Sequence, residues 1–460
     1  MIRRLVIFGA SGDLTSRYLL PALAQLQAAG KLPQRLEIIG VAREDWDTEA
    51  FRQHVAETLQ RHAAGVAPNF RAAVISMLQY RQADVTNPSQ VGSAIDPVMG
   101  PFVAYLALPP SVFSPTVEAL AAIGLPEGCR IVIEKPFGEH LASTQTLNRL
   151  LHQKCPEHMV FRMDHFLGKQ TVQNILGLRF ANRVFEPVWT ANHVQQVEII
   201  WDEVLALEGR ATYYDATGAL KDMLQNHLLQ LLCLVGMEPP RTLDERDFRD
   251  RKVDVLRAVR RLSPQEVERW TVRGRYGAGR IGERAIPAYV DEEGVDPERG
   301  TETFAQVTLM IDNWRWADVP FLLRSGKALR RNRQEIAIHF KPVPHLAFGQ
   351  RTKPPPNVLR LQIDPDRVAL ELNINGPGDP FALELVELDM TLAPQDLPAY
   401  GRLILDVLRG DPTLCIRDDE AEESWRIVEP ILAAWAEDRV PLLQYPAGSD
   451  GPLAMRDPSC

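Results

Sequence analysis

The sequence predicts two domains, a parallel α/β domain followed by an α+β domain built on a large, mostly antiparallel sheet. Over residues 1–160, short β-rich runs alternate with helical segments, which is the pattern of a parallel sheet covered on both faces. Beyond residue 170, a series of separated β-rich runs has few helical segments between them, which is typical of an antiparallel or mixed sheet. We place the boundary between residues 163 and 164, which gives domains at 1–163 and 164–460.

Elements of the first domain follow one another in regular order. Apolar runs predict strands at 3–9, 36–42, 102–108 and 130–135. Amphipathic patterns predict the helices between them, at 16–30, 49–62, 116–124 and 142–153. The first helix ends at Gly30, a residue type that favours helix C-termini, and Pro33 follows shortly afterwards.

The second domain opens with helical patterns and continues mainly with strands. We expect helices at 171–182, 218–236, 398–410 and 420–437. We expect strands at 194–201, 302–312, 335–340, 357–363 and 367–374. The proline-rich stretch 353–357 predicts a rigid turn, and the tail 445–452 is interpreted as a loop.

Composition and charge narrow the functional class. The chain has 460 residues, 45% of them hydrophobic and 24% charged, which is the balance of a globular protein. A net charge of −9 argues against a nucleic-acid partner. No apolar window approaches a membrane span, and the apolar run 5–8 is too short for a signal peptide. Five scattered cysteines without a CxxC pair suggest neither a disulfide framework nor a zinc site. We therefore expect a cytoplasmic protein without a metal.

A glycine-rich turn links the first expected strand to the first helix. Its sequence is GASGDLT, and its candidate nucleotide-binding residues are Gly9, Ser11, Gly12, Asp13 and Leu14. Glycines let the backbone turn tightly and approach a pyrophosphate, whose charge is favoured at the helix N-terminus. The spacing is GxxGxxT rather than GxGxxG, so an ordinary turn capped by Ser11 or Asp13 remains the alternative. In this context the turn favours a dinucleotide-binding Rossmann domain.

Arg43 stands just beyond the second expected strand, where an acidic residue would hold the ribose of NAD. A guanidinium instead matches a 2′-phosphate in charge and geometry, which favours NADP. Glu44 and Asp45 follow directly, so binding of NAD also stays open. The alternative is that Arg43 is a solvated loop charge.

Two further segments, EKPFG at 134–138 and RMDHFLGK at 162–169, accompany the GASGDLT turn. Together they resemble the glucose-6-phosphate dehydrogenase family. The likeness extends over essentially the whole chain, through LQNHLLQ at 224–230, RSGKAL at 324–329, SWRIVEPIL at 424–432 and YPAGSDGP at 445–452. The resemblance implies NADP-dependent oxidation of glucose 6-phosphate at C1 to 6-phospho-D-glucono-1,5-lactone, the first step of the oxidative pentose phosphate pathway. It also implies a homodimer or homotetramer paired through the large sheet.

Loss of hydride from C1 of a sugar requires loss of the O1 proton as well, and a neutral histidine is the natural base near pH 7. His227 borders an apolar helical stripe, where a histidine is more often a satisfied core residue. The resemblance reverses this interpretation and makes His227 the general base. It also implies that the Asp164 carboxylate pairs with His227, which would fix the tautomer of the imidazole.

The resemblance implies the remaining substrate and cofactor contacts. His165 and Lys169 would bind the sugar phosphate; being four residues apart, they would project from the same face of a helix. Lys135 would reach both the nicotinamide side and the sugar, and a cis bond to Pro136 would be most plausible at a site. The other implied contacts are the sugar-hydroxyl acceptors Glu203 and Asp222, the remote lysine Lys327, and Pro109 with Pro110 beside the nicotinamide. Asp222 and His227 are five residues apart, which would place them on roughly adjacent faces of a helix.

Three positions depart from the family pattern, and all concern the sugar phosphate. Tyr18 replaces a lysine, Phe166 replaces the tyrosine of DHYLGK, and Asn332 replaces a basic residue. Arg331 and Arg333 flank Asn332 and are candidates to substitute for it. A weakened phosphate clamp would allow another aldose phosphate or a non-phosphorylated aldose as substrate.

Two other interpretations of the function remain open. One is a different Rossmann sugar dehydrogenase with an EKP segment, and the other is a catalytically idle paralogue that senses NADPH. A second, structural nucleotide site is not expected, because the segment around Asp364 and 370–378 matches the family poorly there.

Overall fold

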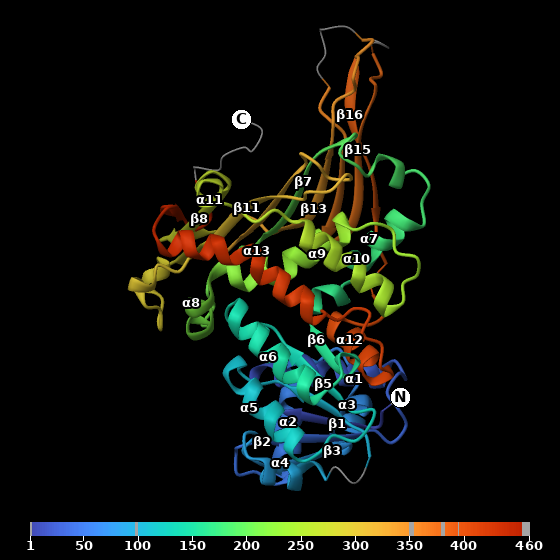
Figure 1. Ribbon diagram of the computed structural model, residues 1–460, viewed down its shortest axis with the longest axis vertical. Coiled ribbons are helices and arrows are strands. Elements are labelled where there is room, and N and C mark those ends of the chain that lie inside the picture. The colour runs from blue at the N-terminus through green and yellow to red at the C-terminus, as the bar shows by residue number, and fades with distance from the viewer. Residues whose placement is uncertain (1, 97–99, 349–353, 379–381, 394, 453–460) are drawn as a thin grey trace. The chain divides into compact units, whose positions relative to one another are not determined.

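The computed structural model describes residues 2–96, 100–348, 354–378, 382–393 and 395–452 (Figure 1). Lys353, the first residue of the expected proline-rich turn, lies outside these residues, as does Cys460. The chain forms two compact units. The first unit contains residues 1–169, 240–250 and 395–422, and the second contains 170–239, 251–394 and 423–460.

A six-stranded sheet with the order β3-β2-β1-β4-β5-β6 forms the centre of the first unit, and all of its neighbouring strands are parallel. The strands are β1 (Arg4–Phe8), β2 (Glu37–Ala42), β3 (Leu78–Gln82), β4 (Val103–Leu106), β5 (Arg130–Glu134) and β6 (Val160–Met163). Leu5, Val6, Ile7 and Phe8 of β1 are all buried, as expected for a central strand covered on both faces. The predicted parallel α/β domain is confirmed.

Helices connect these strands and bury their apolar faces on the sheet. They are η1 (Thr15–Leu19), α1 (Leu20–Ala28), α2 (Thr48–His62), α3 (Pro68–Ser76), α4 (Pro88–Ile95), η3 (Pro110–Val112), α5 (Phe113–Ala122), α6 (Leu141–Lys154), η4 (Glu157–Met159) and η5 (His165–Gly168). A later helix, α12 (Ala399–Arg409), also belongs to this unit, because Leu403 and Leu408 pack into the same apolar core as Leu5 and Ile7.

A nine-stranded sheet with the order β16-β15-β14-β13-β7-β12-β11-β8-β17 forms the second unit. Only the pairs β7–β12 and β8–β17 are parallel, so the predicted large, mostly antiparallel sheet is confirmed. Its strands are β7 (Val194–Asp202), β8 (Thr271–Gly277), β11 (Phe304–Met310), β12 (Pro320–Gly326), β13 (Arg333–Phe340), β14 (Val358–Ile363), β15 (Asp366–Asn375), β16 (Leu383–Thr391) and β17 (Leu442–Pro446). The strand β17 corrects the interpretation of residues 445–452 as loop throughout.

Helices of the second unit are α7 (Gln170–Phe180), η6 (Glu186–Val188), α8 (Ala211–Ala219), η7 (Leu220–Leu228), α9 (Leu229–Gly236) and α11 (Pro264–Trp270). The short elements β9 (Gly279–Ile281), β10 (Arg284–Ile286), η8 (Tyr289–Asp291) and η9 (Pro297–Arg299) follow. Helices α10 (Glu245–Ala258) and α13 (Asp418–Ala436) contribute residues to both units. The single regular helix expected at 218–236 is wrong in one respect, because η7 is a π-helix that begins after a kink at Gly218.

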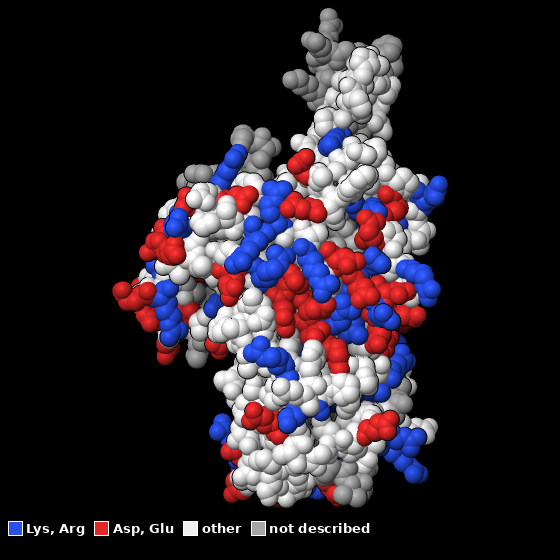
Figure 2. Space-filling model, viewed as in Figure 1, with Lys and Arg blue, Asp and Glu red and all other residues white. Residues whose placement is uncertain are grey.

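Charged side chains of both signs are interspersed on the face of the molecule shown in Figure 2. Many charged residues of the chain form ion pairs, such as Arg417 with Asp250 at 2.6 Å and Arg260 with Asp312 at 2.7 Å. No helix in the described ranges combines the length and the apolar character needed to cross a membrane.

Candidate functional site

The turn after β1 has a backbone that only glycine can adopt. Gly9 has a φ of +82°, and a Cβ built on it would lie 2.1 Å from the carbonyl oxygen of Ala107. The Gly12 amide and the Thr15 hydroxyl both donate to the Gly9 carbonyl, at 3.0 and 2.9 Å. Ser11, Asp13 and Leu14 complete the turn before η1 begins. A tight glycine turn at the carboxyl end of a parallel strand, followed by a helix, is the place where dinucleotide-binding folds hold a phosphate group.

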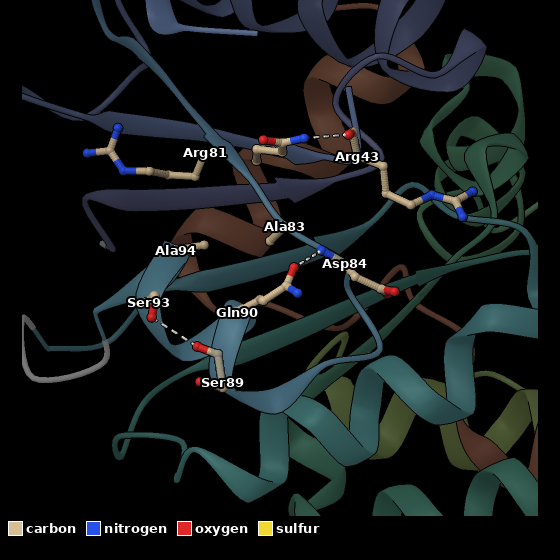
Figure 3. A pocket seen from close by; sticks show the side chains of 9 residues that line it. Arg43, Arg81, Ala83, Asp84, Ser89, Gln90, Ser93 and Ala94 are labelled. Carbon is tan, nitrogen blue, oxygen red and sulfur yellow. Dashed lines mark hydrogen bonds between the residues drawn. The ribbon is translucent and has the colours of Figure 1, made fainter. Parts of the chain in front are cut away.

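A pocket of about 640 Å³ lies at the carboxyl ends of β2 and β3 (Figure 3). It is lined by Arg43, Arg81, Gln82, Ala83, Asp84, Ser89, Gln90, Ser93 and Ala94. The Gln82 amide donates to the Arg43 carbonyl at 3.1 Å, and the Gln90 side chain accepts from the Asp84 amide at 2.7 Å. Hydrogen bonds from Thr86, and to a smaller extent the charge of Arg43, lower the pKa of Asp84. The pocket therefore offers two guanidiniums, those of Arg43 and Arg81, and one ionised carboxylate to a bound group.

Strands β4 and β5 deliver the next two predicted segments to the same edge of the sheet. Pro109 is exposed just after β4, and Lys135 is half-buried directly after β5. The Lys135–Pro136 peptide bond is cis. Glu134, the last residue of β5, is buried and accepts a hydrogen bond from the Tyr105 hydroxyl. Burial chiefly raises the pKa of Glu134 to about 7, and the nearby Asp164 carboxylate adds to the effect.

Asp164 follows β6 and is fully buried. Its carboxylate caps the short 3₁₀ helix η5 by accepting from the Phe166 amide at 2.9 Å. Because η5 ends at Gly168 and Lys169 has an extended backbone, His165 and Lys169 do not share the face of one helix. That expectation from their spacing is wrong. The Lys169 ammonium instead lies 5.5 Å from the centre of the Phe166 ring.

Aromatic rings surround His165. Its imidazole stacks on Tyr400 with centroids 5.5 Å apart, and Phe166 meets it edge-on at 5.0 Å. Tyr18 also stacks on Tyr400, with ring centroids 5.2 Å apart. Two of the three departures from the family pattern, Tyr18 and Phe166, thus belong to one aromatic cluster that orients a predicted phosphate ligand.

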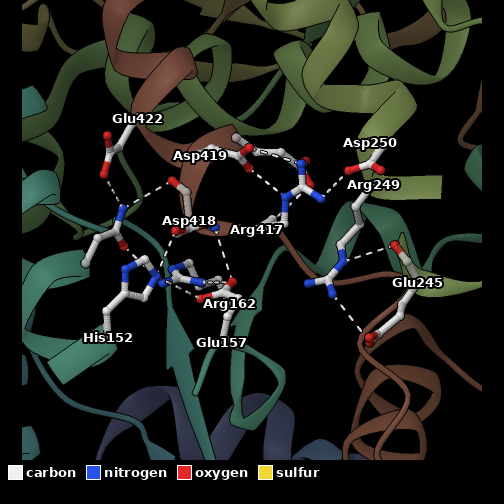
Figure 4. A network of polar contacts seen from close by, with 12 residues as sticks. His152, Glu157, Arg162, Glu245, Arg249, Asp250, Arg417, Asp418, Asp419 and Glu422 are labelled. Atoms are coloured by element: carbon white, nitrogen blue, oxygen red, sulfur yellow. Dashed lines mark hydrogen bonds and ion pairs between the residues drawn. The ribbon is translucent and has the colours of Figure 1, made fainter. Parts of the chain in front are cut away.

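A polar network supports β6, the strand that leads to Asp164 (Figure 4). Arg162 of this strand is fully buried and donates to Glu157 at 2.7 Å and to Asn148 at 3.0 Å. Asn148 in turn donates to Glu422 at 2.9 Å, and His152 lies 2.8 Å from Asp418 at the start of α13. The buried guanidinium links β6 to α6 and to the segment 395–422 of the same unit.

The second unit contains the other predicted residues, and two of them form an ion pair. Glu203 follows β7 and Lys327 follows β12, and these two strands are parallel neighbours. Their side chains meet at 2.6 Å, and the Lys327 ammonium also lies 5.2 Å from the centre of the Tyr214 ring. The Asn332 side chain accepts from the Val204 amide at 2.9 Å. The third departure from the family pattern therefore fixes the backbone next to Glu203.

Arg333, which the sequence offered as a substitute for the missing basic residue at 332, is engaged elsewhere. It lies 2.7 Å from Glu198 and 2.8 Å from Glu335, both on the sheet. A neighbouring guanidinium, Arg360, lies 3.0 Å from Glu335 as well. Arg331 is exposed. Of the two flanking arginines, Arg333 is a structural residue of the sheet.

Asp222 and His227 lie on the π-helix η7, which packs on β12. Hydrogen bonds in a π-helix join residues five apart, so these two residues are about one turn apart on nearly the same side. The two residues therefore lie on a π-helix and not on the ordinary helix that the sequence pattern suggested. The Tyr213 hydroxyl donates to Asp222 at 3.3 Å, whereas His227 is 1% exposed and its amide lies 2.6 Å from the Asn226 side-chain oxygen.

The predicted residues thus fall into two groups, one in each unit. At the carboxyl edge of the parallel sheet lie Gly9, Ser11, Gly12, Asp13, Leu14, Arg43, Pro109, Lys135, Asp164, His165 and Lys169. Around the ends of β7 and β12 and on η7 lie Glu203, Asp222, His227 and Lys327. The sequence interpretation missed Tyr400 and Tyr105, which carry no motif of their own, and Glu134, which it quoted only as part of EKPFG.

A tight glycine turn at the centre of a parallel sheet, followed by a second domain with a carboxylate–lysine pair and a buried histidine, defines a two-domain, dinucleotide-binding oxidoreductase. Comparison with known proteins is more specific. The model for the glucose-6-phosphate dehydrogenase NAD binding domain matches residues 6–174, and the model for the C-terminal domain of that enzyme matches residues 176–458. The chain belongs to the glucose-6-phosphate dehydrogenase family.

Individual relatives match over nearly their whole length. The chain is 42% identical to the glucose-6-phosphate 1-dehydrogenase of Treponema pallidum (strain Nichols), over 98% of this chain and 92% of the relative. It is 43% identical to that of Mycolicibacterium smegmatis (strain ATCC 700084 / mc(2)155), over 97% and 94%. A solved structure of glucose-6-phosphate dehydrogenase in complex with its substrate glucose-6-phosphate superposes with a TM-score of 0.90, at 33% identity and over 98% of this chain and 96% of that one.

Proposed function

We propose that the chain oxidises D-glucose 6-phosphate at C1 to 6-phospho-D-glucono-1,5-lactone with NADP as the acceptor, the first step of the oxidative pentose phosphate pathway. The observation that carries the proposal is the second-unit group, in which a buried imidazole on η7 accompanies the Glu203–Lys327 pair in a chain of this family. We assign dinucleotide binding to residues 1–163, and substrate binding and dimerisation to residues 164–460. A cytoplasmic homodimer or homotetramer without a metal is part of the same proposal.

The residues of the first unit fit a dinucleotide. A Cβ at Gly9 would clash with the carbonyl oxygen of Ala107 at 2.1 Å, so glycine permits the tight turn after β1, where folds of this kind hold a pyrophosphate. The turn residues 9–14 would hold the pyrophosphate, Arg43 the 2′-phosphate, and Pro109 and Lys135 the nicotinamide end. The nicotinamide ring, when bound, supplies the acceptor for the hydride.

The protein side of the chemistry is proton removal and positioning. As the C1–H bond breaks and the C1–O1 double bond forms, the O1 proton passes to the neutral imidazole of His227. Asp164 is assigned, from the family resemblance, as the carboxylate that orients this imidazole and stabilises its charged form. His165 and Lys169 are assigned to the phosphate, Glu203 and Asp222 to sugar hydroxyls, and Lys327 to the remote part of the sugar pocket.

A comparison of glucose 6-phosphate with free glucose tests the proposal and the strength of the phosphate clamp. The two predicted phosphate ligands His165 and Lys169 remain, and a hydrogen bond that involves a charged group contributes about 1.5–3 kcal/mol. We therefore expect kcat/KM to favour the phosphate by roughly 10²–10⁴, measured at 340 nm with several aldoses and aldose 6-phosphates. Equal values would contradict glucose 6-phosphate as the substrate and favour a non-phosphorylated aldose. A preference above ~10⁴ would show that Tyr18, Phe166 and Asn332 do not weaken the clamp.

Cofactor preference depends on the pocket beside β2 and β3. Replacing Arg43 with alanine removes the only predicted partner of the 2′-phosphate, so we expect the KM for NADP to rise about 10–100-fold. The KM for NAD should change less than about threefold, because NAD lacks that phosphate. Arg61→Ala, an exposed arginine in the last turn of α2, is the matched control. An equal rise for both cofactors would assign Arg43 to a different part of the dinucleotide.

A further inference from the structure

The start of the π-helix η7 is held by one residue far away in the sequence. Helix α8 ends in a kink at Gly218, where φ is +72° and ψ is 169°. The two amides that follow therefore have no partner in the preceding helix, and amides at a helix start need an acceptor. Glu302 supplies both acceptors. Its carbonyl accepts from the Ala219 amide at 3.1 Å, and its carboxylate accepts from the Leu220 amide at 2.9 Å.

The Glu302 side chain has little freedom to lie anywhere else. It is 9% exposed, and a Cβ built on Gly218 would lie 2.5 Å from one of its carboxylate oxygens. Glycine is therefore required at position 218 for two reasons. It can adopt the positive φ, and its lack of a Cβ lets the Glu302 carboxylate come close. A negative group is also favoured at a helix N-terminus, because it faces the positive end of the helix dipole.

The residues on either side anchor Glu302 firmly. The Thr301 hydroxyl donates to the Asp215 carbonyl at 2.6 Å, and the Thr303 amide donates to the Gly274 carbonyl at 2.8 Å. The Thr303 carbonyl accepts from the Lys327 amide at 2.9 Å. Adjacent residues of the segment just before β11 therefore fix the backbone of Lys327 and the first turn of the helix that carries Asp222 and His227.

We propose that Glu302 is a positioning residue that holds η7 in its π-helical register, and so holds Asp222 beside His227 on one side of the helix. The proposal rests on the site roles assigned above. In an α-helical register, residues five apart would point in widely different directions, about 140° apart at 3.6 residues per turn. Because π-helices are rare and usually short, this register needs support from outside the helix. The Glu302 carboxylate supplies that support at the first amide of η7.

Charged groups around Glu302 could offer an alternative, purely electrostatic role. Burial raises the pKa of Glu302, and the hydrogen bond from the Leu220 amide opposes this effect. The charges of Lys221 on η7 and Arg273 on β8 also lower the pKa, to a smaller extent. The carboxylate also lines a pocket of about 610 Å³, whose other charged residues are Asp215, Lys221, Arg273, Glu298, Arg299 and Asp438. The experiment must therefore separate the effect of the length of the Glu302 side chain from the effect of its charge.

Three variants of the full-length protein make that separation. Glu302→Gln keeps an oxygen at the same reach and removes the charge, whereas Glu302→Asp keeps the charge and shortens the side chain. Glu302→Ala removes both. We expect kcat to fall roughly 10²-fold in the Ala variant and nearly as far in the Asp variant, since a displacement of about 1 Å can cost that much. The Gln variant should keep kcat within about fivefold, and the KM for NADP should be unchanged in all three.

Hydrogen exchange gives a readout that does not depend on turnover. In the Ala and Asp variants, the amides of residues 219–228 should exchange at least ~10-fold faster than in the parent protein. Glu298→Gln, an exposed glutamate that lines the same pocket, should change neither kcat nor exchange. If the Ala variant does not fold, the Asp and Gln variants decide the question.

Full activity with parent-like exchange in the Ala and Asp variants would overturn the proposal, as would a defective Gln variant beside a normal Asp variant. If the parent protein itself does not oxidise glucose 6-phosphate, the proposed function fails, and the exchange rates alone decide whether Glu302 holds the helix.

Discussion

Replacing His227 with asparagine is expected to lower kcat for glucose 6-phosphate by about 10²–10⁴-fold, with the KM for NADP unchanged. The imidazole is the only side chain assigned to receive the O1 proton, and it is buried on η7 at 1% exposure. Asparagine keeps a polar side chain of similar length but cannot accept a proton near pH 7. Initial rates at 340 nm under saturating substrate and cofactor measure the loss.

His193→Asn is the matched control, because His193 is an exposed histidine of the same unit that has no assigned role. Its kcat should stay within about twofold of the parent value. A His227→Asn enzyme with full turnover would remove the general-base assignment, and with it the role given to Asp164. A loss confined to KM would instead make His227 a binding residue.

Replacing Arg162 with methionine is expected to destabilise the first unit by about 3–5 kcal/mol. The guanidinium is fully buried, and its removal takes from Glu157 an ion pair at 2.7 Å and from the Asn148 side-chain oxygen a hydrogen bond at 3.0 Å. Breaking one side of a buried pair costs more than the pair contributes, because the remaining charge stays away from water. Hydrogen exchange of the β6 amides, residues 160–163, measures the change in the free energy of opening.

Arg149→Ala is the control, since Arg149 lies on the exposed face of α6 and donates only to Thr146. Its effect should stay below about 0.5 kcal/mol. The double variant Arg162→Met with Glu157→Leu should recover part of the stability, because it removes both charges. A single Arg162→Met variant within 1 kcal/mol of the parent would show that the network contributes little.

Much of the fold could be predicted from the sequence because apolar periodicity is a local signal. The strands β1, β2, β4 and β5 are buried runs of Val, Ile and Leu, and all four were predicted within about two residues. Strand β3 was missed because its sequence, LQYRQ, ends in exposed polar residues. Strand β6 was missed because a buried arginine, Arg162, interrupts its short apolar run, VFRM. The place of α12 in the first unit depends on Leu403 and Leu408 packing into the apolar core that also contains residues of β1, which no local pattern records.

The candidate site likewise contains residues that a local motif indicates and residues that only tertiary contacts show. Gly9, Lys135, Asp164 and His227 stand in recognisable motifs, so sequence reasoning found them. Glu302 contacts Leu220 across 82 positions of sequence, and the residues around it carry no chemical motif. The π-helical register of η7 was also invisible, because Leu220, Leu224, Leu228 and Leu231 fit an ordinary helix. Tertiary hydrogen bonds select the register, and a single sequence does not show them.

In the sugar pocket proposed above, the contact between Glu203 and Lys327 sets the state of these two groups before a sugar binds. With side chains 22% and 18% exposed, the carboxylate and the ammonium neutralise one another before any sugar arrives. A hydroxyl that enters must exchange one strong partner for another, so much of the desolvation is completed in the folded protein itself. Discrimination among sugars then depends on how well the hydroxyls of each sugar replace the Glu203–Lys327 ion pair. An unpaired charge at this position would instead attract polar molecules with little selectivity.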